Sequence, residues 1–543
     1  MAQGTYGTGA VQYVPSVSPS DIHIDGKIGK DDSLAWASAP RFNMVNFWEG
    51  GWNGVGGVPV GATPDITTDA RVLYANDTLY VFAQTEDYDL FFAPDTSAIG
   101  APWESDIIFL GIDPAHAADY TEDGAYDGWP WHVDRDSIFA MRIWDRGVTR
   151  VLWTETDSSM VDVSDSSWIN SALVIDQEAG TMTFEGAIAV PGLEAGSQIG
   201  FNIGGEAASL EIYENGDAGE GDYAWFSWQR AAAAGSDVIT NPASYGTLIM
   251  LGADETAYGT GAAQYMPRVT PSFIQIDGKL GKDSLVWASA TQLNMVNNWE
   301  GGWNKVGGVP VGPTPDITTD ARVLYAPDTL YVWAHVEDYD LFFAPDTSSI
   351  GAPWESDLIL LGIDPKHDAS YLEEGANDGW PWHLGQDSIY ALRIWDRGVT
   401  RVQWTEDDSS MVDVRNESWI NSVLDIDQDA GTVTFEAAIY VPGLEPGSQI
   451  GFNIGGEAAS LEVYQGGDAG EGDYAWYSWQ KAAAPGSDIL NRPDSYGTLI
   501  ASAEFATGVD FGGGEELPKT FALQQNYPNP FRGSTTISYT LEH

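Results

Sequence analysis

The sequence predicts an all-β protein, made of two tandem antiparallel β-sandwich domains with a jelly-roll-like arrangement and a short C-terminal β segment. Two observations support this prediction. Short apolar runs alternate with turns rich in Gly, Pro, Asn and Asp, and no long segment has the periodicity of a helix. The chain also repeats itself, since Trp103-Glu-Ser-Asp106 returns 251 residues later as Trp354-Glu-Ser-Asp357. A period this long corresponds to a whole domain.

The first strong pattern along the repeat predicts a hairpin. Residues 71–75 and 78–83 are both strand-like and flank the turn Asn76-Asp77, and the second copy has Pro327-Asp328 at the same turn. Residues 106–112 then form a continuous apolar run. Such a run is typical of a strand that is buried on both faces.

Further apolar runs predict the rest of the sandwich, including a second hairpin around Asp145-Arg-Gly147. The other predicted strands are residues 137–144, 149–154, 181–190, 198–203 and 245–250.

The repeat and the changes in composition predict the domain boundaries. We expect copy 1 at residues 5–251, a linker at 252–256, copy 2 at 257–505, a Gly- and acid-rich spacer at 506–516 and a tail at 517–543. So short a linker is expected to restrict how the two copies sit relative to each other.

The composition excludes several classes of function. The chain has 80 Asp and Glu against 23 Lys and Arg, a formal charge of -57, which makes nucleic acid an unsuitable partner. This acidity indicates a hydrated surface, with bound divalent cations or life at high salt as alternatives. The absence of Cys excludes disulfides and thiolate chemistry. No apolar run is long enough for a transmembrane helix.

Motifs of the common enzyme classes are absent, since the sequence has no Walker loop, no HExxH and no nucleophile elbow. We therefore expect no enzyme, although paired carboxylates of a glycosidase stay an open alternative among so many acids. The chain start lacks the features of a signal peptide. The protein is therefore expected to be either cytosolic or a mature, exported form with an added initiator Met. The motifs of the tail favour the exported form.

The tail resembles the start of the sorting domain of the bacterial type IX secretion system. Asn526-Tyr-Pro-Asn-Pro-Phe531 followed by Thr535-Thr-Ile-Ser-Tyr539 carries the resemblance, which covers only the end of the chain. It implies export by the type IX secretion machinery, to a secreted or cell-surface location. The alternative is a Pro-rich turn before an ordinary strand.

Each copy resembles carbohydrate-binding module family 9, a β-sandwich of the DOMON-like superfamily. The landmarks that carry the resemblance in copy 1, and that return in copy 2, are Ile24-Asp-Gly-Lys-Ile-Gly29 with Trp36, the 72–81 hairpin with Glu86-Asp87, the segment 102–113, and Gly200-Phe-Asn-Ile203 leading to Ser227-Trp228 and Tyr245-Gly-Thr-Leu248.

Members of that family hold a sugar between two aromatic walls, above polar residues. An indole ring covers the C–H face of a pyranose while amides and carboxylates bind its hydroxyls. The resemblance implies that Trp103 and Trp354 form the first wall. It also implies a sugar-contacting arginine, Arg142 in copy 1 and Arg393 in copy 2.

Both copies depart from the family pattern. The segments where the second wall Trp is expected, 229–244 and 481–495, contain no Trp, and the expected acid is replaced by Phe109 or Leu360. An inserted motif offers a substitute aromatic wall. Its candidate residues are Trp129, Trp131 and His132 in copy 1 and Trp380, Trp382 and His383 in copy 2.

A second substitute wall is offered by Trp48 and Trp52, which return as Trp299 and Trp303. The alternative for all these aromatic residues is packing beneath long loops, since Trp is usually largely buried.

Two acidic, glycine-rich turns are candidate calcium sites, because Ca²⁺ prefers carboxylate and carbonyl oxygens. The candidate ligands are Asp217, Glu220 and Asp222 in copy 1 and Asp468, Glu471 and Asp473 in copy 2. A solvated loop is the alternative. No organic cofactor is expected, although Met44 with His132 and Met295 with His383 leave haem b ligation open as a minor alternative.

These observations together predict a secreted, non-catalytic polysaccharide-binding protein with two similar modules. The two modules gain avidity if both bind the same polysaccharide chain. The alternative is a structural or adhesive cell-surface or filament protein that uses the same sandwich fold.

Overall fold

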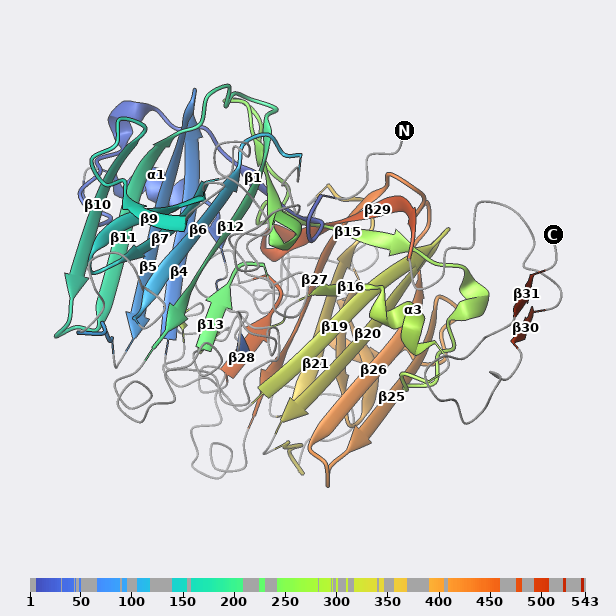
Figure 1. Ribbon diagram of the computed structural model, residues 1–543. Coiled ribbons are helices and arrows are strands. Elements are labelled where there is room, and N and C mark those ends of the chain that lie inside the picture. The colour runs from blue at the N-terminus through green and yellow to red at the C-terminus, as the bar shows by residue number, and fades with distance from the viewer. Residues whose placement is uncertain are drawn as a thin grey trace, which may run out of the picture.

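The chain forms two β-sandwiches, coloured blue to green and green to red in Figure 1, so the predicted all-β fold is confirmed. The computed structural model describes residues 6–30, 32–42, 44, 48–49, 66–87, 90–94, 105–117, 139–153, 158–208, 224–229, 242–281, 283–293, 295, 299–300, 309–310, 317–338, 341–345, 356–368, 390–404, 409–459, 475–480, 493–506, 521–523 and 539–541.

The first sheet of copy 1 consists of β1 (Ala10–Val14), β3 (Trp48–Glu49), β6 (Ile107–Asp113), β7 (Phe139–Trp144), β8 (Gly147–Trp153), β9 (Ser158–Asp162), β12 (Gln198–Ala207), β13 (Ala224–Ser227) and β14 (Gly246–Met250). Strands β9, β8, β7, β6 and β12 follow one another as antiparallel neighbours. β14 and β13 pair with successive parts of the far edge of β12, and β3 pairs with β13. β1 lies beyond β14 and runs parallel to it.

The second sheet of copy 1 consists of β2 (Arg41–Phe42), β4 (Ile66–Ala75), β5 (Thr78–Asp87), β10 (Ile169–Asp176) and β11 (Thr181–Ala189), in the order β10-β11-β5-β4-β2. Its outer face is covered by a satellite core around Trp36 of the short helix α1 (Ser33–Ser38). Single turns of 3-10 helix precede and follow these elements at η1 (Pro19–Asp21) and η3 (Pro242–Ser244).

Copy 2 repeats both sheets. Its strands are β15 (Ala262–Arg268), β16 (Thr291–Leu293), β17 (Trp299–Glu300), β18 (Val309–Pro310), β19 (Ile317–Ala326), β20 (Thr329–Asp338), β21 (Leu358–Asp364), β22 (Tyr390–Trp395), β23 (Gly398–Trp404), β24 (Ser409–Asp413), β25 (Ile420–Asp427), β26 (Thr432–Tyr440), β27 (Gln449–Ala458), β28 (Ala475–Ser478) and β29 (Gly497–Phe505), and its helices are η4 (Pro271–Phe273), α3 (Ser284–Ala288) and η7 (Pro493–Ser495).

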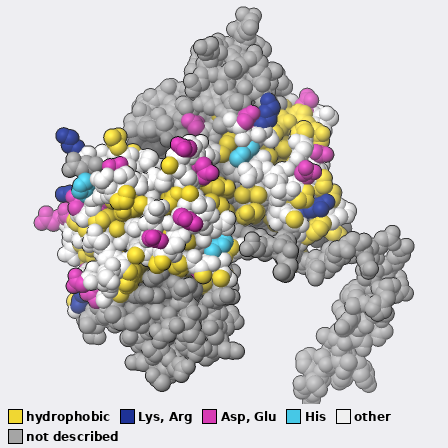
Figure 2. All heavy atoms as spheres, turned by 90° about the horizontal axis from the view of Figure 1, so that it is seen from above, with side chains coloured by type: hydrophobic (Ala, Val, Ile, Leu, Met, Phe, Trp, Pro, Cys, Tyr) yellow, Lys and Arg dark blue, Asp and Glu magenta, His cyan; other side chains and the backbone are white. Residues whose placement is uncertain are grey.

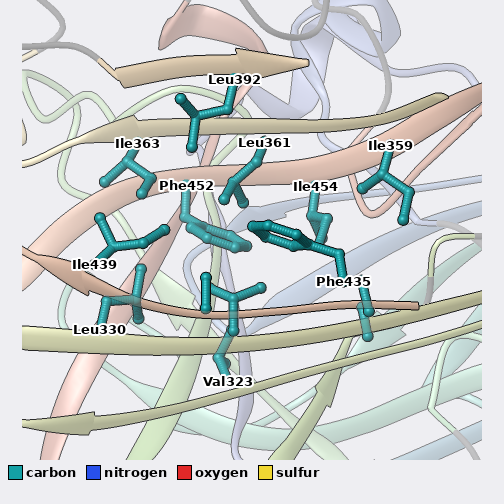
Figure 3. Close-up of a cluster of buried hydrophobic side chains, with 14 of the residues drawn as sticks. Val323, Leu330, Ile359, Leu361, Ile363, Leu392, Phe435, Ile439, Phe452 and Ile454 are labelled. Atoms are coloured by element: carbon teal, nitrogen blue, oxygen red, sulfur yellow. The ribbon is translucent and has the colours of Figure 1, made fainter. Parts of the chain in front are cut away.

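The main core of each copy lies between its two sheets. In Figure 3, Phe435 from one sheet and Phe452 from the other meet at the centre of the copy 2 core, and both side chains are fully buried. The aliphatic side chains around them come from both sheets, and along β21 it is every second residue, Ile359, Leu361 and Ile363, that faces the core. Burying one such side chain contributes about 1.5–3 kcal/mol to stability.

The prediction of a doubly buried strand at residues 106–112 is confirmed, since every residue of β6 is buried. Ile108, Leu110 and Ile112 face the main core. The alternate residues face away from that core and are buried as well, so the outer face of the first sheet is also covered.

The 71–83 hairpin is confirmed, with Asp77 at the turn in a left-handed conformation (φ 59°). The second hairpin is tighter than predicted, because β8 starts at Gly147 and leaves only Asp145 and Arg146 in the turn. β12 also continues to Ala207, four residues beyond the predicted end. Its last residues, Gly-Gly-Glu-Ala, have no apolar pattern of their own, and pairing with β6 and β13 extends the strand.

The opening landmark of each copy surrounds a buried carboxylate. The Glu185 carboxylate accepts hydrogen bonds from the backbone N–H groups of Asp25 and Gly26 at 2.8 and 2.9 Å and from the Trp36 indole at 3.1 Å. Glu436 repeats this arrangement in copy 2. Burial raises the pKa of both carboxyls above the usual value, although these hydrogen bonds oppose the shift. The Asp-Gly and Trp landmarks therefore serve the fold.

The two copies are joined by strand pairing in addition to the linker. β1 of copy 1 and β15 of copy 2 lie side by side in Figure 1 and pair as antiparallel neighbours. The first sheets of both copies thus form one continuous sheet. On the described surface shown in Figure 2, acidic side chains are spread among apolar and uncharged ones, and Lys and Arg occur as isolated groups.

At the end of the chain, β30 (Phe521–Leu523) and β31 (Tyr539–Leu541) form a separate antiparallel pair. This pair includes Tyr539, the last residue of the motif that carries the resemblance to the sorting domain. No helix among the described residues is long and apolar enough to cross a membrane.

Candidate functional site

The candidate site lies on the outer face of the first sheet, which is the face directed away from the main core. Arg142 of β7 is on this face, because its neighbours Met141 and Ile143 both face the core. The Arg142 side chain is buried, with 5% of the residue exposed. The arginine that the resemblance implies as a sugar contact therefore lies on a sheet face, covered by other parts of the protein.

The residues beside Arg142 form a row across three strands. Phe109 of β6 pairs with Arg142 on one side and with Gly204 of β12 on the other. The position where the family pattern expects an acid is thus filled by a ring that is 1% exposed, and the next strand offers no side chain. Among these three residues only Arg142 has a polar side chain, and the row continues to Thr149 of β8 on one side and Ser227 of β13 on the other.

The next row supplies a carboxylate that the sequence analysis did not identify. Glu206 of β12 pairs with Ile107 and is on the outer face, since Phe201 and Ile203 of the same strand face the core. Only 2% of Glu206 is exposed. Alternation along β12 from the core residue Phe201 places Glu206 on the same face as Arg142, but only once the strand is known to continue to Ala207.

Trp144 also belongs to this row. It follows Arg142 by two residues on β7, and the β6–β7 register brings it alongside Ile107. The residue is fully buried, and its indole N–H has no hydrogen-bond partner within the part of the chain that the structure describes. A buried donor without a partner is uncommon in proteins and points to a ligand or a water molecule. The Arg146 guanidinium lies 5.8 Å from the centre of the indole ring.

Copy 2 has the same arrangement, so it is a property of the repeat. Leu360 lies between Arg393 and Gly455, and Glu457 pairs with Leu358. Arg393 is 6% exposed and Glu457 is 2% exposed. The indole N–H of Trp395, the counterpart of Trp144, likewise has no hydrogen-bond partner among the described residues.

These groups can bind a polar ligand from two sides. Arg142 and Glu206 are separated by two strand spacings of about 4.8 Å and one two-residue step of about 7 Å, a span that two long side chains can share. A guanidinium and an indole donate hydrogen bonds, whereas a carboxylate accepts them. A ligand hydroxyl needs both kinds of partner.

The opposite end of the outer face is filled by the protein itself. The Tyr6 hydroxyl donates a 2.8 Å hydrogen bond to Asp113, and the Tyr6 ring stacks on His116 with 4.0 Å between ring centres. A side chain at Gly200 would place its Cβ 1.9 Å from the Tyr6 hydroxyl. The Gly of the Gly-Phe-Asn-Ile landmark is therefore required, because any side chain there would collide with the Tyr6 ring that covers it.

Two more contacts help to fill this end of the outer face. The His116 ring hydrogen-bonds Thr247 at 2.8 Å, and a Cβ at Gly111 would lie 2.3 Å from the Tyr245 hydroxyl. Burial lowers the pKa of His116, although Asp113 opposes this shift, and burial together with Asp113 raises the pKa of Tyr6 well above its usual range. Protein side chains therefore fill this end of the outer face.

Asn202 of the same Gly-Phe-Asn-Ile landmark also has a structural role. The Asn202 amide donates to the backbone carbonyls of Gln229 and Ser244, both at 2.9 Å, and its carbonyl accepts from the Gln229 N–H at 3.0 Å. Asn202 thereby ties the segments after Ser227-Trp228 and before Tyr245 to β12.

Most of the residues predicted for the site lie outside the described residues. They are Trp103, Trp129, Trp131, His132, Trp354, Trp380, Trp382 and His383, together with Trp52, Trp303 and the calcium candidates Asp217, Glu220, Asp222, Asp468, Glu471 and Asp473. Among the described residues, no three His, Cys, Asp or Glu side chains are placed to hold a metal ion.

Two further candidates are placed in part. The backbone of Trp48 pairs with β13, and that of Trp299 pairs with β28. Met44 and Met295, considered for haem ligation, are at most 1% exposed and pack within the main cores.

The chain is similar to solved structures of a carbohydrate-binding module family 9 from Caldicellulosiruptor kristjanssonii. The complex with cellotriose is 15% identical with a TM-score of 0.28, and the match covers 45% of this chain and 94% of that chain. The complex with glucose is 15% identical with a TM-score of 0.29, and the match covers 45% of this chain and 98% of that chain. No protein-family model matches the sequence, and no curated protein matches it.

Proposed function

We propose that each copy binds a carbohydrate on the outer face of its first sheet, and that the chain is a secreted, non-catalytic polysaccharide-binding protein. The observation that supports this proposal is that Arg142, repeated as Arg393, lies buried on this face, since the resemblance implies this arginine as a sugar contact. Export by the type IX machinery and structural calcium belong to the same proposal and rest on the sequence motifs alone.

The polar groups of the site suit a sugar. Each hydroxyl of a pyranose can donate one hydrogen bond and accept others, so it suits a site with a carboxylate on one strand and N–H donors on another. In this proposal, Glu206 and Glu457 supply the carboxylate that the family pattern expects at positions 109 and 360. Hydrogen bonds that involve a charged partner are the stronger ones, and here they form away from water.

The charge of the chain narrows the ligand class to neutral polysaccharides. At a formal charge of -57, the protein repels polymers that carry uronate or sulfate groups. Arg142 and Glu206 lie on the same outer face, so the site itself is not purely cationic. Trp103 and Trp354, or the Trp129 and Trp131 segment, would supply the aromatic wall above these groups.

The test is binding of the full chain to soluble and insoluble neutral polysaccharides, compared with a uronate polymer. The Glu206→Gln with Glu457→Gln variant keeps side-chain size and removes both carboxylates. We expect at least tenfold weaker binding, because a hydrogen bond to a charged group contributes about 1.5–3 kcal/mol. The matched control is Glu194→Gln with Glu445→Gln, which removes two exposed carboxylates at equivalent positions.

Unchanged binding in the Glu206→Gln and Glu457→Gln variant, with an unchanged melting temperature, would contradict the site. Replacing the wall residues, Trp103→Ala with Trp354→Ala, tests the aromatic part separately and is expected to abolish pull-down. If no neutral polysaccharide binds the unmodified chain, the function itself is wrong.

The pairing of β1 with β15 favours a second candidate function, a structural or adhesive surface protein, because the module uses a strand edge as a contact surface. Concentration-dependent assembly of the full chain without sugar binding would support this candidate. A Soret band after addition of haem would support the minor haem alternative.

A further inference from the structure

The register between β1 and β15 is reciprocal. Counterparts in the two copies are 252 residues apart here, so that Val11 corresponds to Ala263 and Gln12 to Gln264. Val11 pairs with its own counterpart, Ala263. Ala10 pairs with Gln264 and Gln12 with Ala262, which are the same contact made in both directions. The two strands are therefore related by a local two-fold axis through the Val11–Ala263 pair.

The hydrogen bonds at the edge of this pairing are also reciprocal. The Tyr13 N–H donates to Gly261 at 2.9 Å, and the Tyr265 N–H donates to the counterpart Gly9 at 3.2 Å. Gly9 and Gly261 both have a φ of 75°, in the left-handed region that favours glycine.

The glutamine side chains repeat this symmetry. Gln12 donates through its amide to the Thr260 carbonyl at 3.2 Å, and Gln264 donates to the Thr8 carbonyl at 3.1 Å. Both glutamines are nearly buried, at 3% and 6% exposure. Each copy thus gives its partner the same bond that it receives.

A small apolar cluster covers the other face of the junction. It contains Val11, Ala263 and Ile500, with Tyr13, Ile249 and Tyr265 packed against them. Every copy 1 member of this cluster has its copy 2 counterpart in the cluster. A contact in which the same patch meets itself is the isologous type that forms symmetric homodimers.

We propose that the outer edge of the first strand of each copy is a self-recognition surface, whose partner is a second copy of the same strand. In this chain the duplication supplies that second copy. The junction is then held by the strands themselves, and the linker only raises their effective concentration. This proposal does not depend on carbohydrate binding.

A single substitution can free one strand for a new partner. Tyr265→Pro removes the N–H that bonds Gly9 and leaves the neighbouring residues, which pair with β29, unchanged. The edge of β1 then matches its own chain less well than it matches a second β1, because the Gly9 carbonyl has lost its donor. We expect two such chains to pair through β1 with β1, which gives a dimer in sedimentation experiments as the concentration rises, whereas the unmodified chain stays monomeric.

Two further variants complete the test. In Tyr13→Pro with Tyr265→Pro both edges are broken, so we expect a monomer with a broader distance distribution between spin labels on the two copies. Tyr265→Ala removes the same ring but keeps the N–H, and it is expected to behave like the unmodified chain.

The outcomes separate the two parts of the proposal. A Tyr265→Pro variant that stays monomeric at every concentration, while its inter-copy distances broaden, would overturn self-recognition. Unchanged inter-copy distances in the double-proline variant would show that strand pairing does not hold the junction. A dimer that disappears when Tyr13→Pro is added to Tyr265→Pro supports the proposal.

Discussion

The two ends of the outer face of the first sheet differ in what fills them. At the Asp113 end, Tyr6 and His116 pack over Gly200 and form hydrogen bonds within the protein. At the Ile107 end, an arginine and a glutamate are buried beside an indole N–H that has no partner among the described residues. The first end uses its landmark residues for folding, and the second holds the polar groups of the proposed site.

The comparison predicts that substitutions at the filled end affect folding and leave ligand affinity unchanged. Gly200→Val with Gly451→Val would force a Cβ to within 1.9 Å of the Tyr6 or Tyr258 hydroxyl. We expect a loss of about 3 kcal/mol in the free energy of unfolding, at the upper end of the usual range for overpacking, measured by urea denaturation.

The control for this prediction is Gly29→Val with Gly281→Val, where the nearest atoms to a new Cβ are 3.7 and 3.9 Å away. A loss of stability as large in the control would remove the argument that Tyr6 and Tyr258 require these glycines.

At the other end, substitutions should weaken ligand binding more than they affect folding. Arg142→Gln with Arg393→Gln removes the guanidinium from both copies. We expect polysaccharide affinity to fall roughly tenfold to a hundredfold, which corresponds to about 1.5–3 kcal/mol for a charged hydrogen bond. Isothermal titration with a soluble neutral oligosaccharide measures this loss.

Exposed lysines of the opening landmark provide a control with the same change of charge. Lys27→Gln with Lys279→Gln removes one cation from each copy at an exposed position. Affinity that falls equally in this pair would mean that net charge, and not the outer face, controls binding.

The smallest expected effect is a dependence of stability on pH at the filled end. Burial lowers the pKa of His116 and His367 below the usual 6.5. The unfolded chain therefore binds protons more readily than the folded chain. The stability that the neutral, buried histidines contribute is complete above pH 6.5 and is lost as the pH falls through the lowered pKa. Between pH 7 and pH 5 we expect a loss below about 1 kcal/mol for each histidine.

The variant His116→Asn with His367→Asn isolates this effect, since Asn tolerates the left-handed φ of 48° and 52° at these positions. Its melting temperature should fall less on acidification than that of the unmodified chain. Glu185 and Glu436 act in the opposite direction, because their raised pKa values favour the folded state as protons bind. Both carboxyls are present in the variant and in the unmodified chain, so their effect cancels when the two changes in melting temperature are compared.

The local patterns of the sequence are sufficient to predict the strands with strong apolar character. The 71–83 hairpin and β6 could be predicted because turn residues and a continuous apolar run mark them. β1 could not, since Ala10–Val14 is short and contains Gln12, and its conformation depends on pairing with β14 and β15. The landmarks Asp25, Gly26 and Trp36 could be recognised, but their role around Glu185 depends on contacts distant in the sequence.

The candidate site could be predicted in part. The resemblance implies Arg142 as a sugar contact, and the structure places it buried on the outer face; its contact with a sugar stays a prediction. Glu206 follows two glycines at the end of a predicted strand, so nothing local indicated that the strand continues to Ala207. Trp144 was predicted as part of a strand, but the lack of a partner for its indole N–H among the described residues depends on tertiary packing.

The reciprocal junction between β1 and β15 also sets a limit on how many copies can be joined in this way. Within its own sandwich, β1 pairs with β14, whereas β15 pairs with β29 and, at Arg268, with β19. The edge at residues 10–12 of β1 and 262–264 of β15 is used for the contact between the two copies. A third repeat added to the chain would find both of these edges occupied. Because a two-fold contact closes after two members, a third copy would have to join through a different surface.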